Sequence, residues 1–381
     1  MKRLNGCRIR LVLVGIVAAI VMGAGSAKAD FIFGEPTNLG LTVNSSYEEI
    51  DPCISADGLE LYFHSYRPPD GYGNHDLWIT RCPSPNDAWG MPINLGRTVN
   101  SSSFDGCPYI SSDALSLFFC SNRSGGLGNT DIWVTTRPTK TDAWGPPANL
   151  GPIVNTSSIE AHPYISADGL SLYFADVVAP GETPTRPGGY GGGDIWVSTR
   201  QTSERMPEGY WGEPQNLGAV VNSSAYDAAP CISSDGLMLF FHSSRTGGYG
   251  DHDIWIARRK TPVDPWEEPV NLGPPFNTSL GDGGPAISAD GKTLYFMSGG
   301  TSSGEGNFYL YQAPIIPIVD LNNDGIVDAT DMCIMVDNWG TDNSLCDIGP
   351  MPWGDGVVDV QDLIVLAEHL FEKLPGRPIQ P

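Results

Sequence analysis

The residues best suited to chemistry lie near the C-terminus, in the stretch VDLNNDGIVDATDM at residues 319–332. Counted from Asp320, oxygen-bearing side chains recur at the first, third, fifth, ninth and twelfth positions of a loop whose sixth residue is Gly325. Oxygens at these offsets, with a glycine for the sharp turn, are the ligand set of a helix-flanked calcium loop. The pattern predicts a Ca²⁺ site formed by Asp320, Asn322, Asp324, the carbonyl of Ile326, Asp328 and Asp331.

A second, less complete copy of this loop follows in GDGVVDVQDLIVLAEHLFEK, residues 354–373. Simple counting places Met351 and Trp353, which lack side-chain oxygens, at the first and third positions, whereas an insertion in the loop would restore Asp347 as the first ligand. The predicted ligands of this second Ca²⁺ site are Asp347, Asp355, the carbonyl of Val357, Asp359 and Asp362.

Two loop-plus-helix units within residues 319–373 resemble a type I dockerin, and CDIGPMPWGDGVVDVQDLIVLAEHLFE is similar to planctomycete-type dockerins. The resemblance implies docking onto a cohesin-like protein module in an extracellular assembly; in the best-known cases such assemblies degrade polysaccharides. It places the partner contacts at the tenth and eleventh loop positions, which here are Ala329, Thr330, Val360 and Gln361.

A module of this size buries little apolar surface and commonly needs a metal or a disulfide. We expect its apolar stripe to join two groups of side chains, Met332, Met335, Val336 and Trp339 on one side and Leu363, Leu366, Leu370 and Phe371 on the other. Calcium should therefore fold the module, because the loop aspartates repel one another without a cation.

The middle of the chain is an internal repeat. Units aligned on the Asn of VNSS or its variants begin at Asn44, Asn100, Asn155, Asn222 and Asn277. Each unit has a proline followed by Ile-Ser, then an alternating strand, a turn and a second strand, and four units close with a short strand such as PINLG. Four short strands per unit, punctuated by Gly, Asn and Asp, are typical of a propeller blade.

The ends of the repeat indicate how the ring closes. The fifth unit stops at NFYLYQAP without its last strand, whereas FIFGEPTNLGLTV near the N-terminus contains an unpaired copy of that strand. The N-terminal strand is therefore predicted to complete the last blade, giving five blades and no open edge.

The segments PCISADGLELYF and SSRTGGYGDHDIW resemble the TolB-like family of WD-type propeller repeats, over about residues 31–313. The resemblance implies a propeller fold but no particular activity, because propellers carry enzymes, lectins and protein-binding platforms alike. The count of five departs from the six blades usual in that family.

An acidic residue stands five positions after each repeated Asn: Glu49, Asp105, Glu160, Asp227 and Asp282. If the Asn-Ser segments are loops between blades, these acids ring the mouth of the central channel. Two alternatives follow. Each carboxylate accepts N–H groups of its own turn, or the five converge on a cation or cationic ligand, which would raise their pKa values in its absence.

Longer loops of the same face carry Tyr72, Tyr190 and Tyr249, which could stack on sugars or on a protein partner, with His75 and His252 beside them. Alternatively these loops are ordinary turns, which four aspartates tie to the strands: Asp76, Asp131, Asp194 and Asp253.

Seven cysteines follow residue 29, so at least one is free or pairs between chains. The seventh and twentieth positions after the Asn flank the same hairpin, which predicts a Cys107–Cys120 disulfide to within one residue of register. Cys333 and Cys346 are candidates for a second bridge.

The N-terminus reads as a secretory signal peptide, with a basic stretch, the apolar run LVLVGIVAAIVMGAG and small residues around a cut after Ala29. Its removal would change the formal charge from −23 to −28, which disfavours nucleic acid and anionic lipid as partners. No later segment is long and apolar enough to span a membrane.

The predicted fold class is an all-β five-bladed propeller plus a small all-α calcium-binding dockerin domain. The expected segments are 1–29 signal peptide, 30–313 propeller, 314–318 linker, 319–373 dockerin-like domain and 374–381 tail. No P-loop or H-E-x-x-H motif is present, and the repeated acids single out no acid–nucleophile pair.

We therefore expect a secreted or cell-surface protein whose propeller binds an unidentified protein or glycan. The alternatives are a glycoside hydrolase with its site in the channel and a purely structural surface protein.

Overall fold

The computed structural model describes residues 31–371, apart from residue 86, residues 179–185, 201–210, 300–306, 318, 323–325, 342, 344–345 and 350–356. The expected signal peptide and the tail at 374–381 lie outside the described residues, as do Asp324 and Asp355.

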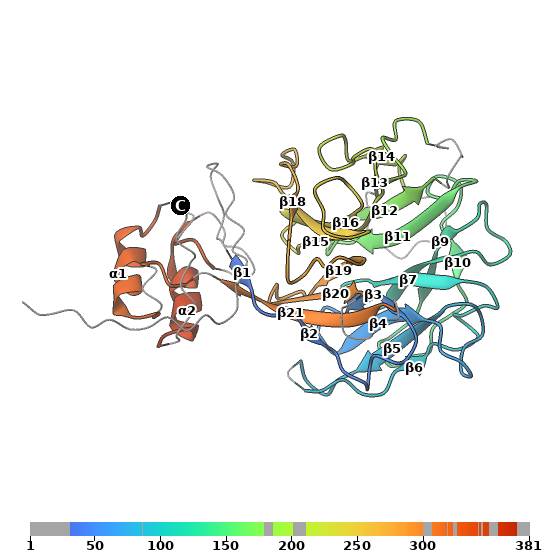
Figure 1. Ribbon diagram of the computed structural model, residues 1–381, viewed down its shortest axis with the longest axis horizontal. Helices are drawn as coiled ribbons and strands as arrows, with labels where there is room; N and C mark the ends of the chain where they lie inside the picture. The colour runs from blue at the N-terminus through green and yellow to red at the C-terminus, as the bar shows by residue number, and fades with distance from the viewer. Residues whose placement is uncertain are drawn as a thin grey trace, which may run out of the picture.

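Five antiparallel sheets surround a common centre (Figure 1). Blade 1 contains β3 (Glu49–Ile54), β4 (Glu60–Ser65), β5 (Asp76–Arg81) and β6 (Ile93–Asn94). Blade 2 contains β7 (Asp105–Ile110), β8 (Ser116–Ser121), β9 (Asp131–Thr136) and β10 (Ala148–Asn149). Blade 3 contains β11 (Ile159–Ile165), β12 (Ser171–Val177), β13 (Gly193–Thr199) and β14 (Gln215–Asn216). Blade 4 contains β15 (Asp227–Ile232), β16 (Met238–Ser243), β17 (Asp253–Arg258) and β18 (Val270–Asn271).

Blade 5 joins both ends of the propeller segment. Its strands are β19 (Asp282–Ile287), β20 (Thr293–Ser298), β21 (Tyr309–Pro317) and β2 (Thr37–Asn38). Because β2 pairs with β21, the predicted closure by the N-terminal strand is confirmed. The inner strands β3, β7, β11, β15 and β19 meet around the centre, and β19 contacts β3 to complete the ring. The chain is a five-bladed β-propeller.

The repeated Asn fastens each blade to the preceding one. The Asn100 side chain accepts from the Leu77 N–H at 2.9 Å and donates to the Leu77 carbonyl at 3.1 Å. Asn44 makes the same pair of bonds with Leu310, across the closure of the ring. The asparagines are buried, so each completes backbone bonding that water cannot supply.

The boundary between propeller and C-terminal segment differs from the expected one. Residues 314–317, predicted as linker, continue β21, and the added strand β1 (Phe31–Phe33) pairs with them from Pro317 to Ile315. The side chain of Phe33 packs on the aromatic rings of Phe240 and Phe276. The strand is therefore anchored to the propeller core rather than free to act as a linker.

The C-terminal segment holds the two described helices, α1 (Ala329–Asp337) and α2 (Val360–Glu368), to one side of the propeller in Figure 1. Its core contains Met335, Val365 and Leu366 together with Val319, Val327, Cys346, Ile348 and Val358. The predicted apolar stripe is partly wrong, because Val336, Trp339 and Phe371 are exposed. None of the described helices is long and apolar enough to cross a membrane.

The predicted disulfides are not formed; all seven described cysteines are free. Cys120 lies opposite Gly106, not Cys107, because the inner strand bulges between Gly106 and Tyr109. Cys107 takes a φ of 49°, so it leaves the strand register, and its side chain packs in one small cluster with Cys120 and Ala161. Cys333 is exposed whereas Cys346 is buried in the module core.

Candidate functional site

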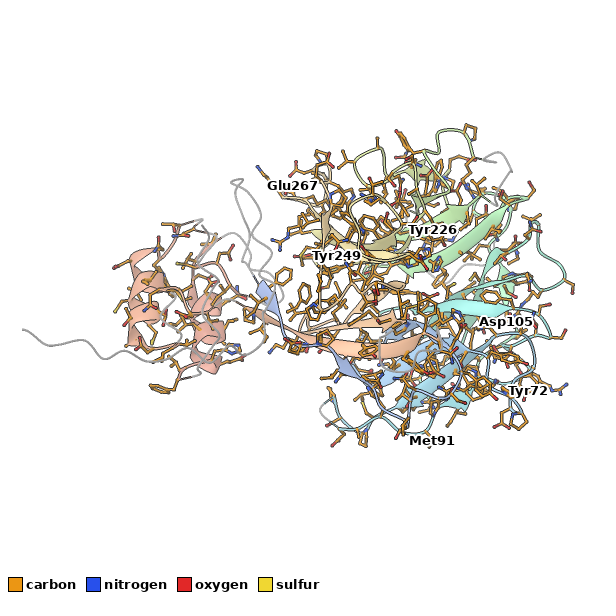
Figure 2. The ribbon with its side chains drawn as sticks, in the orientation of Figure 1. Tyr72, Met91, Asp105, Tyr226, Tyr249 and Glu267 are labelled. Atoms are coloured by element: carbon orange, nitrogen blue, oxygen red, sulfur yellow. The ribbon has the colours of Figure 1, made fainter. Side chains whose placement is uncertain are left out.

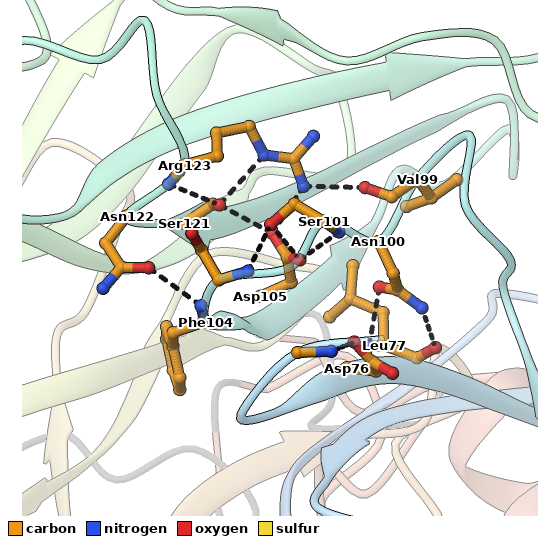
Figure 3. Close-up of polar contacts among 12 residues, drawn as sticks. Asp76, Leu77, Val99, Asn100, Ser101, Phe104, Asp105, Ser121, Asn122 and Arg123 are labelled. Atoms are coloured by element: carbon orange, nitrogen blue, oxygen red, sulfur yellow. Dashed lines mark hydrogen bonds and ion pairs between the residues drawn. The ribbon is translucent and has the colours of Figure 1, made fainter. Parts of the chain in front are cut away.

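The five acidic positions are buried, each with no exposed surface. In blade 2, Asp105 accepts from the Ser101 N–H at 2.6 Å, the Ser101 hydroxyl at 2.8 Å and the Ser121 hydroxyl at 2.6 Å (Figure 3). The corresponding backbone bond to the residue four positions earlier recurs in every blade. These are the bonds of the first alternative, in which each carboxylate organises its own loop.

An arginine neutralises four of these acids. Arg123 binds Asp105 and the Val99 carbonyl, and its guanidinium stacks over Phe119 and Trp133. Three further pairs repeat this contact, Arg67–Glu49 at 2.8 Å, Arg186–Glu160 at 3.4 Å and Arg245–Asp227 at 2.6 Å. Within the described part of the chain, no basic side chain forms an ion pair with Asp282, and burial raises the pKa of Asp282 to about 6.

The outer loops are held by the aspartates at the start of the third strands. Asp76 accepts from the Tyr72 N–H, Asp194 from Tyr190 and Asp253 from Tyr249, at 2.5, 2.6 and 2.5 Å. These bonds match the ordinary-turn alternative for the aspartates. The tyrosine rings remain 38–56% exposed, and Tyr72 lies at the outer edge of the ring in Figure 2. The structure therefore presents three similarly supported aromatic side chains to solvent.

The two halves of the C-terminal segment share one arrangement of aspartates. Asp331 accepts from the N–H groups of Leu321, Asn322 and Asp328, while Asp362 accepts from Ile348, Gly349 and Asp359. Asp328 and Asp359 cap the following helices. Asp320 and Asp347 stand immediately before the paired N–H donors, and both are buried. The halves thus align with Asp347 equivalent to Asp320, as the predicted insertion requires.

The other expected contact residues are placed differently in the two halves. Ala329, Thr330 and Val360 are exposed and Gln361 is partly buried, all in the first turns of the helices. Ile326 and Val357, whose carbonyls were predicted as ligands, have exposed side chains. Asp331 and Asp362 form no ion pair with a described basic residue, although both are fully buried.

A feature that the sequence interpretation missed lies where the five inner strands meet. The seventh residue after each repeated Asn has a φ of 49–55°, and each is followed by proline. The bulge turns these side chains into the channel, where they line one cavity together. The five residues are Asp51, Cys107, His162, Ala229 and Gly284.

Three of these side chains join two histidines of neighbouring strands in a central polar cluster, defined here as Asp51, His64, Cys107, His162 and His242. His162 Nε2 lies 3.5 Å and His64 Nδ1 3.8 Å from Asp51 Oδ2. The Cys107 N–H donates to His64 Nδ1 at 3.1 Å, and the His162 and His242 rings are 5.4 Å apart. Together with His75 and His252, which contact the His64 and His242 rings, the cluster gathers five of the protein's six histidines.

The imidazoles of the central polar cluster differ in the direction of their pKa shifts. Burial lowers the pKa of His64 to about 3, although Asp51 opposes the shift, and burial holds the pKa of His242 well below its ordinary value. Burial also disfavours charge on His162, but Cys107 and Asp51 together raise its pKa above the usual range. Burial alone would raise the pKa of Asp51, whereas His162 holds it low. The charged forms of Asp51 and His162 thus favour each other, whereas burial disfavours charge on His64 and His242.

The cluster was detectable in principle from the prolines. A proline cannot donate to the ladder, so its recurrence in every inner strand indicates a bulge. The residue before it then leaves the strand register, which simple alternation does not predict. The sequence does not tell which residue types meet at the centre. That becomes visible only when the five bulges are arranged in a ring.

Comparison with known proteins adds little beyond the fold. No family model and no curated protein matches the chain. Among solved structures it is similar to TolB from Acinetobacter baumannii, with 13% identity, a TM-score of 0.40, and coverage of 70% of this chain and 54% of that one. The chain thus spans about half the length of that TolB structure.

Two enzyme structures are also similar to this chain. The endo-arabinase from Bacteroides thetaiotaomicron shares 17% identity over 72% of this chain and 95% of that one, with a TM-score of 0.47. The GH43_1 enzyme from Xanthomonas citri, complexed with xylotriose, shares 18% over 74% and 90%, with a TM-score of 0.49. The propeller assignment itself rests on the five sheets described above.

Proposed function

We propose that this chain is an exported recognition protein, in which the propeller binds a protein or glycan and the C-terminal segment holds calcium and docks onto a cohesin-like module. The observation that carries the proposal is the twofold arrangement in the C-terminal segment. In each half a fully buried aspartate closes its loop against backbone N–H groups, and an exposed first helical turn follows.

The donor set fits calcium. A carboxylate offers about four lone-pair sites, and among the described residues Asp331 uses three of them for N–H groups, which leaves capacity for a cation. Asp320, also buried, adds a second carboxylate at the head of the same loop. Hard oxygen donors suit calcium, and a bound cation would offset the cost of burying these charges.

The docking surface proposed for a cohesin-like partner is the exposed side of the two helices. Val360 and Ile364 are each 54% exposed one turn apart on α2, and Ala329 and Thr330 are exposed at the start of α1. Apolar side chains flanked by small and polar ones suit a protein interface.

The calcium and docking proposal is tested on the full chain with the Asp320→Ala variant. We expect calorimetry to show one fewer bound calcium ion and a weaker interaction with a purified cohesin module. Asp337→Ala, which removes an exposed aspartate at the end of α1, is the matched control and should change neither. Equal calcium stoichiometry in Asp320→Ala and the unaltered chain would contradict the calcium site.

Ligand recognition by the propeller is assigned to the tyrosine-bearing loops. Tyr72, Tyr190 and Tyr249 project from three blades, and each loop is fixed by the same aspartate bond. Exposed aromatic rings on fixed loops can stack on sugars or on side chains at little entropic cost.

A glycan array with Tyr249→Ala tests this assignment against Met91→Ala. Met91 is 73% exposed at the outer edge of blade 1 (Figure 2). Loss of binding in both variants, or in neither, would contradict recognition by these loops.

Binding is favoured over hydrolysis by the carboxylates of the channel. Glycoside hydrolysis requires two carboxylates flanking one bond. Only Asp51 among the five seventh-position residues is acidic, and the acidic positions beyond it are buried in hydrogen bonds within their own blades. Release of sugar from arabinan or xylan by the purified chain would reverse this preference.

A further inference from the structure

We propose that the central polar cluster is a zinc site, in which Asp51, His64 and Cys107 bind the ion and His162 is the fourth ligand. The four residues come from blade 1, blade 2 and blade 3, so the ion would link three blades at the axis of the ring. This site is separate from the calcium loops of the C-terminal segment.

The geometry comes first. One potential ligand atom from each of Asp51, His64 and Cys107 lies within 4.8 Å of the other two, and all three residues are buried. It is the one such group of three or more among the described residues. Ligand atoms around tetrahedral zinc are roughly 3.3–3.8 Å apart, given bonds of about 2.0–2.3 Å. A small contraction of the side chains therefore brings the three atoms to coordinating positions.

The donor chemistry selects the metal. A thiolate, imidazole nitrogen and carboxylate oxygen together suit zinc or another borderline transition metal, whereas calcium takes oxygen alone. Binding would displace the Cys107 thiol proton to solvent, because the thiolate is the ligand. The Cys107 N–H bond to His64 Nδ1 shows that this nitrogen carries its lone pair, which coordination would redirect to the ion.

Two buried polar atoms point to a missing partner. Asp51 Oδ1 and His162 Nδ1 have no hydrogen-bond partner among the described residues, although both are shielded from solvent. Such atoms usually cost folding free energy unless a water or an ion satisfies them. His162 already lies 3.5 Å from Asp51, and a flip of its ring presents either nitrogen to the ion.

The two remaining seventh-position residues leave room for the ion. A Cβ added to Gly284 would lie 2.7 Å from Asp51 Oδ1, so the fifth blade accommodates that carboxylate only with glycine. Ala229 contributes only a methyl group to the cavity in blade 4. Three ligating and two small residues therefore occupy five equivalent backbone positions.

The experiment titrates the reduced, full-length chain with cobalt(II), a spectroscopic substitute for zinc, at saturating calcium so that the C-terminal loops are filled. We expect about one equivalent of cobalt to give the visible bands of tetrahedral coordination and a near-ultraviolet thiolate charge-transfer band, both abolished by zinc. Zinc should also raise the unfolding temperature of the propeller, since the ion binds only the folded ring.

Variants assign the ligands. Cys107→Ser should lose the charge-transfer band and the thermal shift, and His64→Gln should weaken cobalt binding at least about tenfold. Cys231→Ser, which alters another buried thiol of the channel, is the matched control and should retain both signals. Circular dichroism of each variant establishes that it is folded. Absence of a charge-transfer band in the unaltered chain, or its persistence in Cys107→Ser, overturns the site.

Discussion

Asp282 and Asp227 occupy equivalent positions in neighbouring blades, yet replacing each with asparagine should change stability in opposite directions at neutral pH. Asp227 pairs with Arg245 at 2.6 Å, whereas Asp282 accepts from the Thr278 N–H and hydroxyl of its own turn, at 2.6 and 2.9 Å. Burial raises the pKa of Asp282 from 3.8 to about 6. Ionising Asp282 in the folded protein therefore costs free energy that a neutral asparagine side chain at the same position would not.

The magnitude follows from linkage. A raised folded-state pKa gives stability that is fully present below the unfolded pKa near 3.8 and is lost as pH rises through about 6. At pH values above the folded-state pKa, the total loss of stability reaches about 3 kcal/mol. About 2 kcal/mol of this loss falls between about pH 4.5 and about pH 7.5. Asp282→Asn should remove the free-energy cost of ionising this carboxyl. The new amide N–H donor should cost about 1 kcal/mol, so the free energy of unfolding should rise by roughly 1–2 kcal/mol at about pH 7.5.

Urea unfolding followed by tryptophan fluorescence measures the free energy of unfolding of the propeller, because eight of the ten tryptophans lie in the propeller segment. Asp227→Asn should instead lose roughly 3 kcal/mol at about pH 7.5, since it leaves the largely buried Arg245 guanidinium, whose side chain is 13% exposed, without its counter-ion. Equal destabilisation of both variants, or a wild-type minus Asp282→Asn difference that does not change with pH, would refute the reasoning.

Three further substitutions test the construction of the ring. Asn44→Ala should lower the free energy of unfolding by about 2–3 kcal/mol and speed hydrogen exchange in β2, because the Leu310 N–H and carbonyl lose their partners. Unchanged hydrogen exchange in β2 would argue against closure of the ring by Asn44. Gly191→Ala should lower the free energy of unfolding, measured by thermal unfolding, by roughly 3 kcal/mol, since its Cβ would lie 2.4 Å from the Ala225 carbonyl oxygen. Gly192→Ala should lower it by under about 1 kcal/mol, because the nearest atom to its Cβ would be 3.7 Å away. Arg123→Lys should lower the free energy of unfolding in urea by about 2 kcal/mol, because lysine cannot reproduce the forked bonds to Asp105 and Val99 or the stacking on Trp133. Arg97 stacks over the exposed Tyr72, so Arg97→Lys should lower it by well under about 1 kcal/mol.

The propeller was predictable because each unit repeats the same local signals. The repeated Asn, the turn residues and the alternating strands all recur, and the unpaired strand near Thr37 indicated closure. The extent of β21 was not predictable, since residues 314–317 pair only because β1 lies beside them. Local pattern does not report a partner so distant in sequence.

The acids and cysteines show where register reasoning fails. Glu49 and its equivalents stood at a constant offset, but only the structure shows that hydroxyl and backbone donors surround each one. Cys107 and Cys120 were placed opposite each other by counting, which assumes an unbroken ladder. The bulge at Cys107 breaks that assumption and moves the side chain toward the other blades.

β21 has a mechanical consequence. It is at once the third strand of blade 5 and the stem of the C-terminal segment, with β20 on one flank and β2 and then β1 on the other. A force drawing the C-terminal segment away from the propeller would load these ladders lengthwise, so many hydrogen bonds must break together rather than one after another. A propeller tethered through this strand would resist tension far better than one tethered through a flexible loop.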